Sequence, residues 1–317
     1  MSFSKQKSVL VISSIFIFLC LFTFSELLDS QVQANPKDKK LIYKSNEGDV
    51  LVYESVRENT RTMERGGETS DFTTKRKYNF QLKTEKVDSL ICFELTVNKL
   101  ESSSEGGRRF RGSRLDPEKI KGKRVRLKIK PTGELSEITA IDSISFGERR
   151  GGDNNRGRRP GSRGNPVNQL RVAFFQTPDK PIKLGDSWTE DYQEPAQLDA
   201  SFRGRFSQER KVGGKSKYTF VGEEKKNGLD CFHIKVESEY SRESHGSMRG
   251  NAVNSEGEGE SKADVWFAYE EGILVEYTQS DFYEGTTAFS GEMNRTMANS
   301  NESKATLKLV KWEPAHK

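Results

Sequence analysis

The chain has few of the residues on which metal and catalytic sites usually depend. It contains three Cys and three His in 317 residues, and the His stand far apart at positions 233, 245 and 316. Cys231 and His233 would share one face of a strand, but a zinc site needs three or four ligands and nothing nearby completes the set. No Gly-x-Ser-x-Gly nucleophile motif is present. The sequence therefore predicts no catalytic residue, no metal site and no cofactor, and a hydrolase with converging carboxylates is kept only as the last alternative.

Hydrophobic residues are also scarce, at 32% of the chain. Polar segments must therefore form much of the molecule. Two of them, residues 102–114 and 147–164, are rich in Gly, Arg and Ser, and we predict that they are mobile loops because they cannot bury enough apolar surface. Residues 103–168 carry 17 Lys/Arg against 8 Asp/Glu, a surplus of +9 in a chain whose net charge is +5. The basic character therefore belongs to one region, and the remainder sums to −4.

The second of these segments suggests a surface for polyanions. Guanidinium groups attract phosphate and carboxylate, and a run of them typifies a surface that binds anionic polymers or headgroups. The alternative is a solvated insert with no specific partner. For an exported chain the expected partner is an anionic cell-envelope surface, and no nucleic acid is expected. The residues of this hypothesis are Arg149, Arg150, Arg156, Arg158, Arg159 and Arg163.

Residues 1–34 have the layout of a secretory signal peptide. Lys5 and Lys7 precede an apolar run from Val9 to Phe24, and Val32-Gln33-Ala34 resembles a small-residue cleavage site. The run is shorter than the roughly 20 residues that a membrane-spanning helix needs. We therefore predict export to the periplasm or the cell exterior, with a retained N-terminal anchor as the alternative.

Removal of the leader would leave Cys92 and Cys231 as the only thiols. In an oxidising compartment two such residues can form a disulfide. Sequence spacing does not show whether their Cα atoms come within bonding range, so two separate free cysteines are the other interpretation.

A repeated set of landmarks indicates an internal duplication. Cys92 precedes Gly133 by 41 residues, and Cys231 precedes Gly272 by 41 residues. A Gly-Asp pair lies upstream in each copy, at residues 48–49 and 185–186. The same landmarks occur in the same order and with nearly the same spacing in both copies, which is typical of two related halves.

Most of the remaining sequence alternates between apolar and polar residues. Val125, Leu127 and Ile129 alternate with Arg and Lys, as expected of a strand with one packed face. The only helix that we predict outside the leader covers residues 166–176 and begins with Pro. The fold class is therefore mainly β, with antiparallel curved sheets or an open barrel built from two duplicated halves and one short linking helix. The predicted organisation is a leader at 1–34, a first half at 35–164, a helix and linker at 165–184, and a second half at 185–317.

Three short segments resemble secreted or periplasmic bacterial proteins of uncharacterised function. They are Pro181-Ile182-Lys183-Leu184-Gly185-Asp186-Ser187-Trp188, the stretch from Tyr43 to Asp49, and the stretch from Tyr269 to Val275. The resemblance spans most of residues 41–312, and the Arg-rich segments depart from it. Such proteins are more distantly similar to the lipoprotein-carrier group, whose resemblance implies a curved antiparallel sheet around an apolar cavity and brings no catalytic residue with it.

These observations favour a non-enzymatic exported protein that binds a hydrophobic or amphipathic ligand, such as a lipid, in a concave sheet. The alternatives are a structural or adhesion module that binds polyanionic surfaces, and the hydrolase already mentioned. The sequence leaves the oligomeric state open. The side chains that we predict to face the ligand are Phe80, Phe93, Leu95, Tyr218, Phe232, Ile234 and Phe267.

Overall fold

The computed structural model describes residues 40–65, 67–106, 117–143, 174–178, 180–200, 206–248, 251–291 and 294–315. These residues belong to one compact unit, which covers residues 40–317. Within the described ranges the one α-helix is α2 (Pro117–Ile120). The strands are β1 (Val50–Arg65), β2 (Glu68–Val87), β3 (Ile91–Gly106), β4 (Arg124–Ile129), β5 (Leu135–Ala140), β6 (Ser187–Ala200), β7 (Phe206–Lys226), β8 (Leu229–Met248), β9 (Asn251–Ala268), β10 (Ile273–Ser290) and β11 (Arg295–Glu313).

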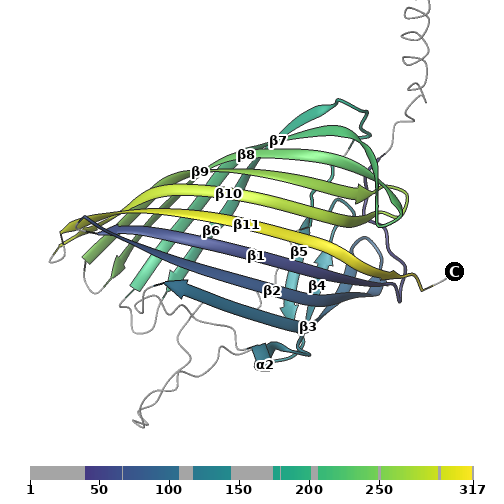
Figure 1. The fold of residues 1–317 in the computed structure, drawn as a ribbon, viewed down its shortest axis with the longest axis horizontal. Coiled ribbons are helices and arrows are strands. Elements are labelled where there is room, and N and C mark those ends of the chain that lie inside the picture. The colour runs from purple at the N-terminus through teal and green to yellow at the C-terminus, as the bar shows by residue number, and fades with distance from the viewer. Residues whose placement is uncertain are drawn as a thin grey trace, which may run out of the picture. The chain divides into compact units, whose positions relative to one another are not determined.

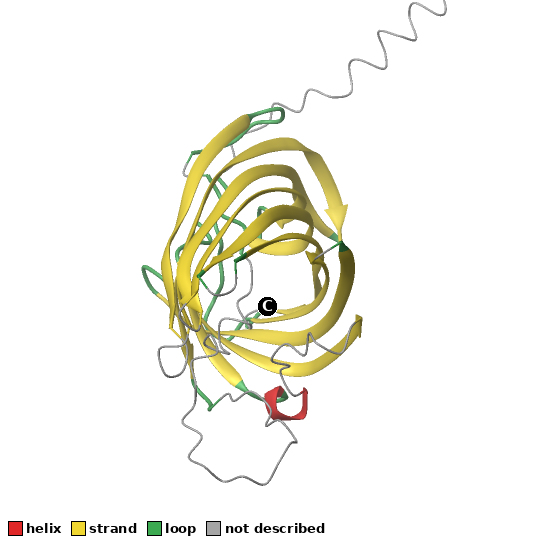
Figure 2. Cartoon of the chain, turned by 90° about the vertical axis from the view of Figure 1, so that its left-hand side faces the viewer, coloured by secondary structure: helices red, strands yellow, loops and turns green. Residues whose placement is uncertain are grey.

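All eleven strands form one antiparallel sheet (Figure 1). Their order is β5-β4-β3-β2-β1-β11-β10-β9-β8-β7-β6. Consecutive strands therefore pair from β1 to β5 and from β6 to β11, and β1 pairs with β11. The strands curl around a common interior (Figure 2). The two ends of the sheet, β5 and β6, are not paired with each other. The predicted mainly β class with an antiparallel curved sheet is confirmed.

The two halves of the sheet repeat one pattern of strands and turns. β1 to β5 form one meander, β6 to β10 form a second, and β11 joins them. Before the first strand of each meander, Gly48 and Gly185 adopt φ values of 92° and 86°. Each glycine N–H donates to a backbone oxygen two strands along the chain, Thr84 O and Phe220 O, at 2.9 Å in both cases. The hydrogen bonds therefore place the two Gly-Asp pairs at equivalent positions.

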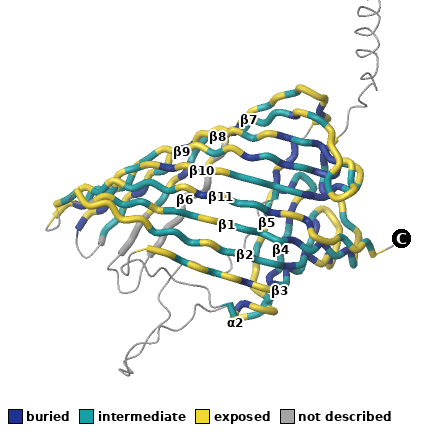
Figure 3. The backbone as a smooth tube through the Cα atoms, in the orientation of Figure 1, coloured by how far each residue is buried: buried dark blue, intermediate teal, exposed yellow. Residues whose placement is uncertain are grey.

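The buried residues gather at one end of the sheet (Figure 3), where the alternating sequence forms the apolar core. On β4, Val125, Leu127 and Ile129 are fully buried. Side chains from residues 41, 43, 174, 175 and 182 belong to this core or pack against it, and the backbone N–H of Phe175 donates to Tyr43 Oη at 3.0 Å. Burying an apolar side chain of this size contributes about 1.5–3 kcal/mol, so this end supplies much of the stability.

The other end of the sheet is polar on both faces, and long strands extend into it. The strands other than β4 and β5 are 14–21 residues long. β3 continues through Gly106 by pairing with β2, so residues 102–106 of the predicted loop form a strand, and residues 107–114 lie outside the described part. At the apolar end, residues 174–176 are neither helix nor strand, so the predicted helix is wrong there, and residues 166–173 lie outside the described part. Along residues 102–106, hydrogen bonds to β2 satisfy one edge of the backbone without an apolar pattern.

Within the described ranges, no helix is long and apolar enough to cross a membrane.

Candidate ligand-binding site

The concave face changes from apolar to polar along the strands, and a row of hydroxyl groups marks the change. Ser216 on β7 is directly opposite Ser238 on β8, which is opposite Ser261 on β9, which is opposite Asp281 on β10. The Oγ atoms of Ser216 and Ser238 are 2.8 Å apart. We call these four residues the serine row. It lies two residues beyond Tyr218 on β7 and Val236 on β8, and four residues beyond Tyr277 on β10. These three residues are partly buried and pack against the core.

A cavity of about 260 Å³ opens over the serine row. Three of its lining side chains are guanidinium groups and one is a carboxylate, so its formal charge is +2. We call it the arginine–serine cavity. Its lining residues are Arg57, Arg210, Val212, Ser216, Ser238, Tyr240, Arg242, Ser261, Gln279 and Asp281.

The Arg242 guanidinium lies over two neighbouring tyrosine rings in this region. Its guanidinium carbon lies 4.8 Å from the ring centre of Tyr240 and 4.8 Å from that of Tyr283. The two rings are parallel within 2°. The hydroxyl of Tyr240 donates to Asp281 Oδ2 at 2.8 Å. Stacking fixes the guanidinium while leaving its in-plane N–H groups directed at its edges.

Glycines make room for the two tyrosine rings. A Cβ added to Gly259 would lie 2.3 Å from Tyr240 Cζ, and one added to Gly257 would lie 2.5 Å from Tyr283 Oη. Gly214, directly opposite Tyr240, would bring a Cβ within 2.7 Å of Tyr240 Cβ. The rings therefore lie flat against the backbone of neighbouring strands. A side chain at Gly259 would displace the Tyr240 ring, and one at Gly257 or Gly214 would also clash with the backbone of the neighbouring strand.

The charges around Tyr283 confirm that several guanidinium groups converge here. Burial raises the pKa of Tyr283 above its ordinary value of 10.0, and the positive charges of Arg242, Arg210 and Arg61 oppose that rise. Among the described residues, the buried Nε atoms of Arg210 and Arg242 have no hydrogen-bond partner. The site thus contains unused, desolvated donors.

The residues predicted to face a ligand have a different place. Phe80, Phe93, Leu95, Phe232, Ile234 and Phe267 are at most 5% exposed and belong to the core cluster, and Tyr218 packs against it. None of these seven lines the three cavities that we describe. Residues 174–175 lie over them, with the Phe174 ring stacked 6.1 Å from that of Phe93. A ligand would reach them only after this segment moved.

The other predicted groups are placed only in part. The six arginines of the polyanion hypothesis lie outside the described residues. Cys92 and Cys231 are both free cysteines, so the structure contains no bond between them. Cys231 is fully buried, and burial raises the pKa of its thiol to about 11.

His233 does not form a metal site with Cys231. Its Nδ1 lies 2.9 Å from Glu224 Oε1 and its Nε2 lies 2.7 Å from Asp264 Oδ1, so the two carboxylates flank the ring on opposite sides. In the described part of the chain, no group of three or more His, Cys, Asp or Glu side chains could hold a metal ion.

The opposite face of the polar end is acidic. Glu243 is directly opposite Glu256, Glu239 is opposite Glu260, and Glu258 is opposite Glu284. We call these six residues the acidic rows. They contribute to two shallow cavities of about 840 and 640 Å³ on this face. None of the six forms an ion pair with another described residue.

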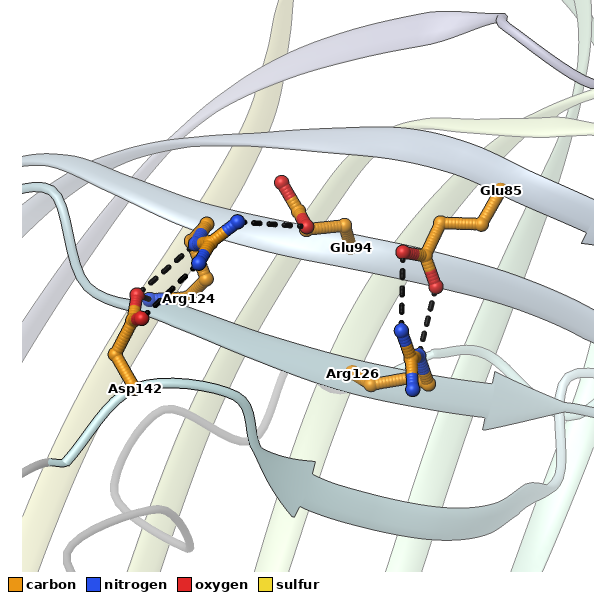
Figure 4. Close-up of polar contacts among 5 residues, drawn as sticks. All are labelled: Glu85, Glu94, Arg124, Arg126 and Asp142. Carbon is orange, nitrogen blue, oxygen red and sulfur yellow. Dashed lines mark hydrogen bonds and ion pairs between the residues drawn. The ribbon is translucent and has the colours of Figure 1, made fainter.

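Ion pairs hold the strands next to the β5 edge (Figure 4). Arg124 Nε and Nη2 donate to the two carboxylate oxygens of Asp142 at 3.0 and 3.1 Å. Arg126 Nε and Nη2 donate to Glu85 at 2.7 and 3.2 Å. These hydrogen bonds hold the pKa values of Asp142 and Glu85 below their ordinary range. They tie β2, β4 and the segment after β5 together where the sheet is open.

Comparison with known proteins finds only weak structural matches. No protein-family model and no curated protein matches the chain. The chain is similar to the outer membrane channel from Pseudomonas putida F1, with 9% identity, coverage of 88% of this chain and 100% of that one, and a TM-score of 0.25. A DUF1329 family protein from Desulfovibrio piger ATCC 29098 has 10% identity, coverage of 81% and 85%, and a TM-score of 0.14. OccK11 (OpdR) of Pseudomonas aeruginosa has 7% identity, coverage of 86% and 100%, and a TM-score of 0.23. Scores this low say nothing about what this chain binds.

Proposed function

We propose that this chain is a non-enzymatic exported protein that binds an amphipathic ligand on the concave face of its sheet. The observation that carries the proposal is the gradient along that face. Partly buried Tyr218, Val236 and Tyr277 lie beside the serine row, and the arginine–serine cavity lies over that row. An amphipathic molecule would place its apolar part along the first group and its polar end in the cavity. The leader-like residues 1–34 support the exported location.

The size of the cavity supports a polar end rather than a whole ligand. Its volume of about 260 Å³ is below the roughly 300–1,000 Å³ of pockets that enclose complete small molecules. None of the described cavities is lined by the core residues that were predicted to face a ligand, so a wholly apolar ligand has no open cavity among them. The amphipathic version needs no rearrangement of that core.

Trp188 provides a direct test. Its ring stacks on Tyr218 at 5.1 Å, on the concave face next to the serine row. In a Trp266→Phe/Trp312→Phe background, Trp188 is the remaining tryptophan. We expect decyl phosphate or decyl maltoside, below its micelle concentration, to change the Trp188 emission saturably, and native mass spectrometry to detect a complex of fixed ratio. If neither probe binds in either measurement, the proposed function is wrong.

A further inference from the structure

We infer that the polar end of this ligand is an anion, namely a carboxylate, sulfate or phosphate group, and that Arg57, Arg210 and Arg242 bind it. This inference rests on the proposed function for the apolar part of the ligand. It adds the charge and the hydrogen-bonding chemistry of the end that enters the arginine–serine cavity.

The first step is the charge of the cavity. Arg57, Arg210 and Arg242 line it, and none of them forms an ion pair with a described carboxylate. The one lining carboxylate, Asp281, accepts the hydrogen bond of Tyr240. Three guanidinium groups against one carboxylate leave +2 on a partly enclosed surface. Such a surface raises the local concentration of anions and favours their binding.

The second step is the supply of donors. The Nε atoms of Arg210 and Arg242 are buried without a partner in the described structure. A buried N–H that has lost water and gained no acceptor destabilises the free protein, and a bound anion would reverse that loss. Each guanidinium edge offers parallel N–H groups that match two oxygens of a carboxylate, sulfate or phosphate. A neutral headgroup rich in hydroxyls cannot form such paired, charge-assisted hydrogen bonds with the two guanidinium groups.

The third step is the rigidity of the site. Arg242 lies over the rings of both Tyr240 and Tyr283, and these rings lie against glycines. Arg57 Nε lies 3.5 Å from Ser303 Oγ and approaches from β1, across β11 from the other groups. A donor set that is fixed before binding loses less entropy on capturing an anion. The serine hydroxyls can donate to the remaining oxygens.

The test compares four probes by isothermal titration calorimetry, using the full chain with its leader removed. The probes are decyl phosphate, decanoate, uncharged decyl maltoside and inorganic phosphate. Both anionic amphiphiles should bind at least about tenfold more tightly than decyl maltoside. Arg210→Gln and Arg242→Gln should each weaken the anionic probes by on the order of tenfold and leave decyl maltoside unchanged. Lys217→Gln, which removes an exposed charge from the other face of β7, is the matched control and should change nothing.

Asp281→Asn keeps the test independent of any folding defect in the arginine variants. It removes the one negative charge of the cavity and keeps an oxygen acceptor for Tyr240, so anionic probes should bind on the order of tenfold more tightly. Equal binding of the charged and uncharged amphiphiles, or no change in Asp281→Asn, would overturn the inference while leaving the proposed function intact. Tight binding of inorganic phosphate alone would show a site for a free anion and contradict the amphipathic proposal instead.

Discussion

Asp49 and Asp186 hold the same turn in the two halves of the sheet. Asp49 Oδ2 accepts the backbone N–H of Asn46 at 2.7 Å, and Asp186 Oδ2 accepts that of Lys183 at 2.9 Å. The two carboxylates differ in their surroundings. Asp49 is 4% exposed and also accepts the N–H of Ala315 at its Oδ1, whereas the Asp186 turn is partly exposed. The same turn should therefore contribute more to the free energy of unfolding in the first half than in the second.

This difference predicts unequal effects of the same substitution. Asp49→Ala should lower the free energy of unfolding by about 2–3 kcal/mol, because it removes a buried carboxylate that accepts two backbone N–H groups. Asp186→Ala should lower it by only about 1 kcal/mol, because water can replace the lost acceptor. Urea unfolding followed by circular dichroism measures both values, and equal losses would contradict this account of the turn.

The packing of Tyr240 against Gly259 gives a second prediction. Gly259→Ala places a methyl group where the Tyr240 ring lies, so it should cost about 1–3 kcal/mol and weaken binding of anionic probes. Gly222 is the control, since no atom lies within 4 Å of a Cβ added there. Gly222→Ala should change the free energy of unfolding by less than about 0.5 kcal/mol. If the two variants unfold alike, the ring does not occupy the position described.

The Glu85–Arg126 pair predicts a specific dependence on pH. Its hydrogen bonds lower the pKa of Glu85 from 4.5 in the folded state. A lowered folded pKa stabilises the protein above the unfolded value, and this stabilisation disappears as pH falls through the folded value. Arg126→Gln should therefore unfold at lower urea than the unchanged protein at pH 7, and the gap should narrow below pH ~4.

The control for this pair is Lys121→Gln, which removes an exposed cation without an ion pair in the described structure. It should unfold like the unchanged protein at both pH values. A gap for Arg126→Gln that persists undiminished in acid would mean that Arg126 acts through packing alone.

The acidic rows predict that salt stabilises the protein. Like charges directly opposite each other on neighbouring strands are destabilising, so Glu256→Gln should raise the free energy of unfolding by about 0.2–1 kcal/mol at low salt. In 1 M NaCl, where the screening length is about 3 Å, the gain should disappear. Glu302 is the control because its direct neighbours, Thr60 and Phe282, are uncharged. Thermal melts of Glu256→Gln and of the control Glu302→Gln at low and high salt measure this effect. A gain in stability that persists in 1 M NaCl would rule out charge repulsion as its cause.

The buried thiol of Cys231 predicts slow alkylation. A pKa of about 11 leaves the thiol protonated at neutral pH, and the thiolate is the reactive form. Iodoacetamide should label Cys231 in the native protein more slowly than Cys92, and the two should react alike in urea. A protein that takes up no label even in urea would instead contain the disulfide considered from the sequence, and its mass would be lower by two hydrogens.

The parts of the fold that were predictable are those that depend on backbone conformation and a buried face. The turns at Gly133 and Gly272 have φ values of 85° and 70°, which glycine adopts without strain, and both lie where the repeat placed them. The alternation on β4 identified its buried residues correctly. The Asn227-Gly228 turn between β7 and β8 was not recognised, although Asn-Gly is a strong hairpin signal and both residues have positive φ.

The candidate site could not be predicted for a different reason. Its residues come together through register, since Ser216, Ser238, Ser261 and Asp281 are neighbours only when four strands pair in one alignment. One signal was available within a single strand. Tyr240 and Arg242 continue the inward phase of Phe232 and Ile234 on β8, which places a cation on the concave side. The same reasoning that identified the apolar residues would have found them if it had been extended along the strand.

The pairing of β1 with β11 also sets when the cavity can exist. Most of its lining comes from β7 to β10, but Arg57 comes from β1, and only β11 connects β1 to that part of the sheet. Pairs so distant in sequence form slowly, because the entropy of closing a long loop is lost before the contacts repay it. Either half could build its own meander earlier. Full affinity for an anion would therefore appear only when the two halves join. The rate at which this affinity returns during refolding would report the rate at which β1 pairs with β11.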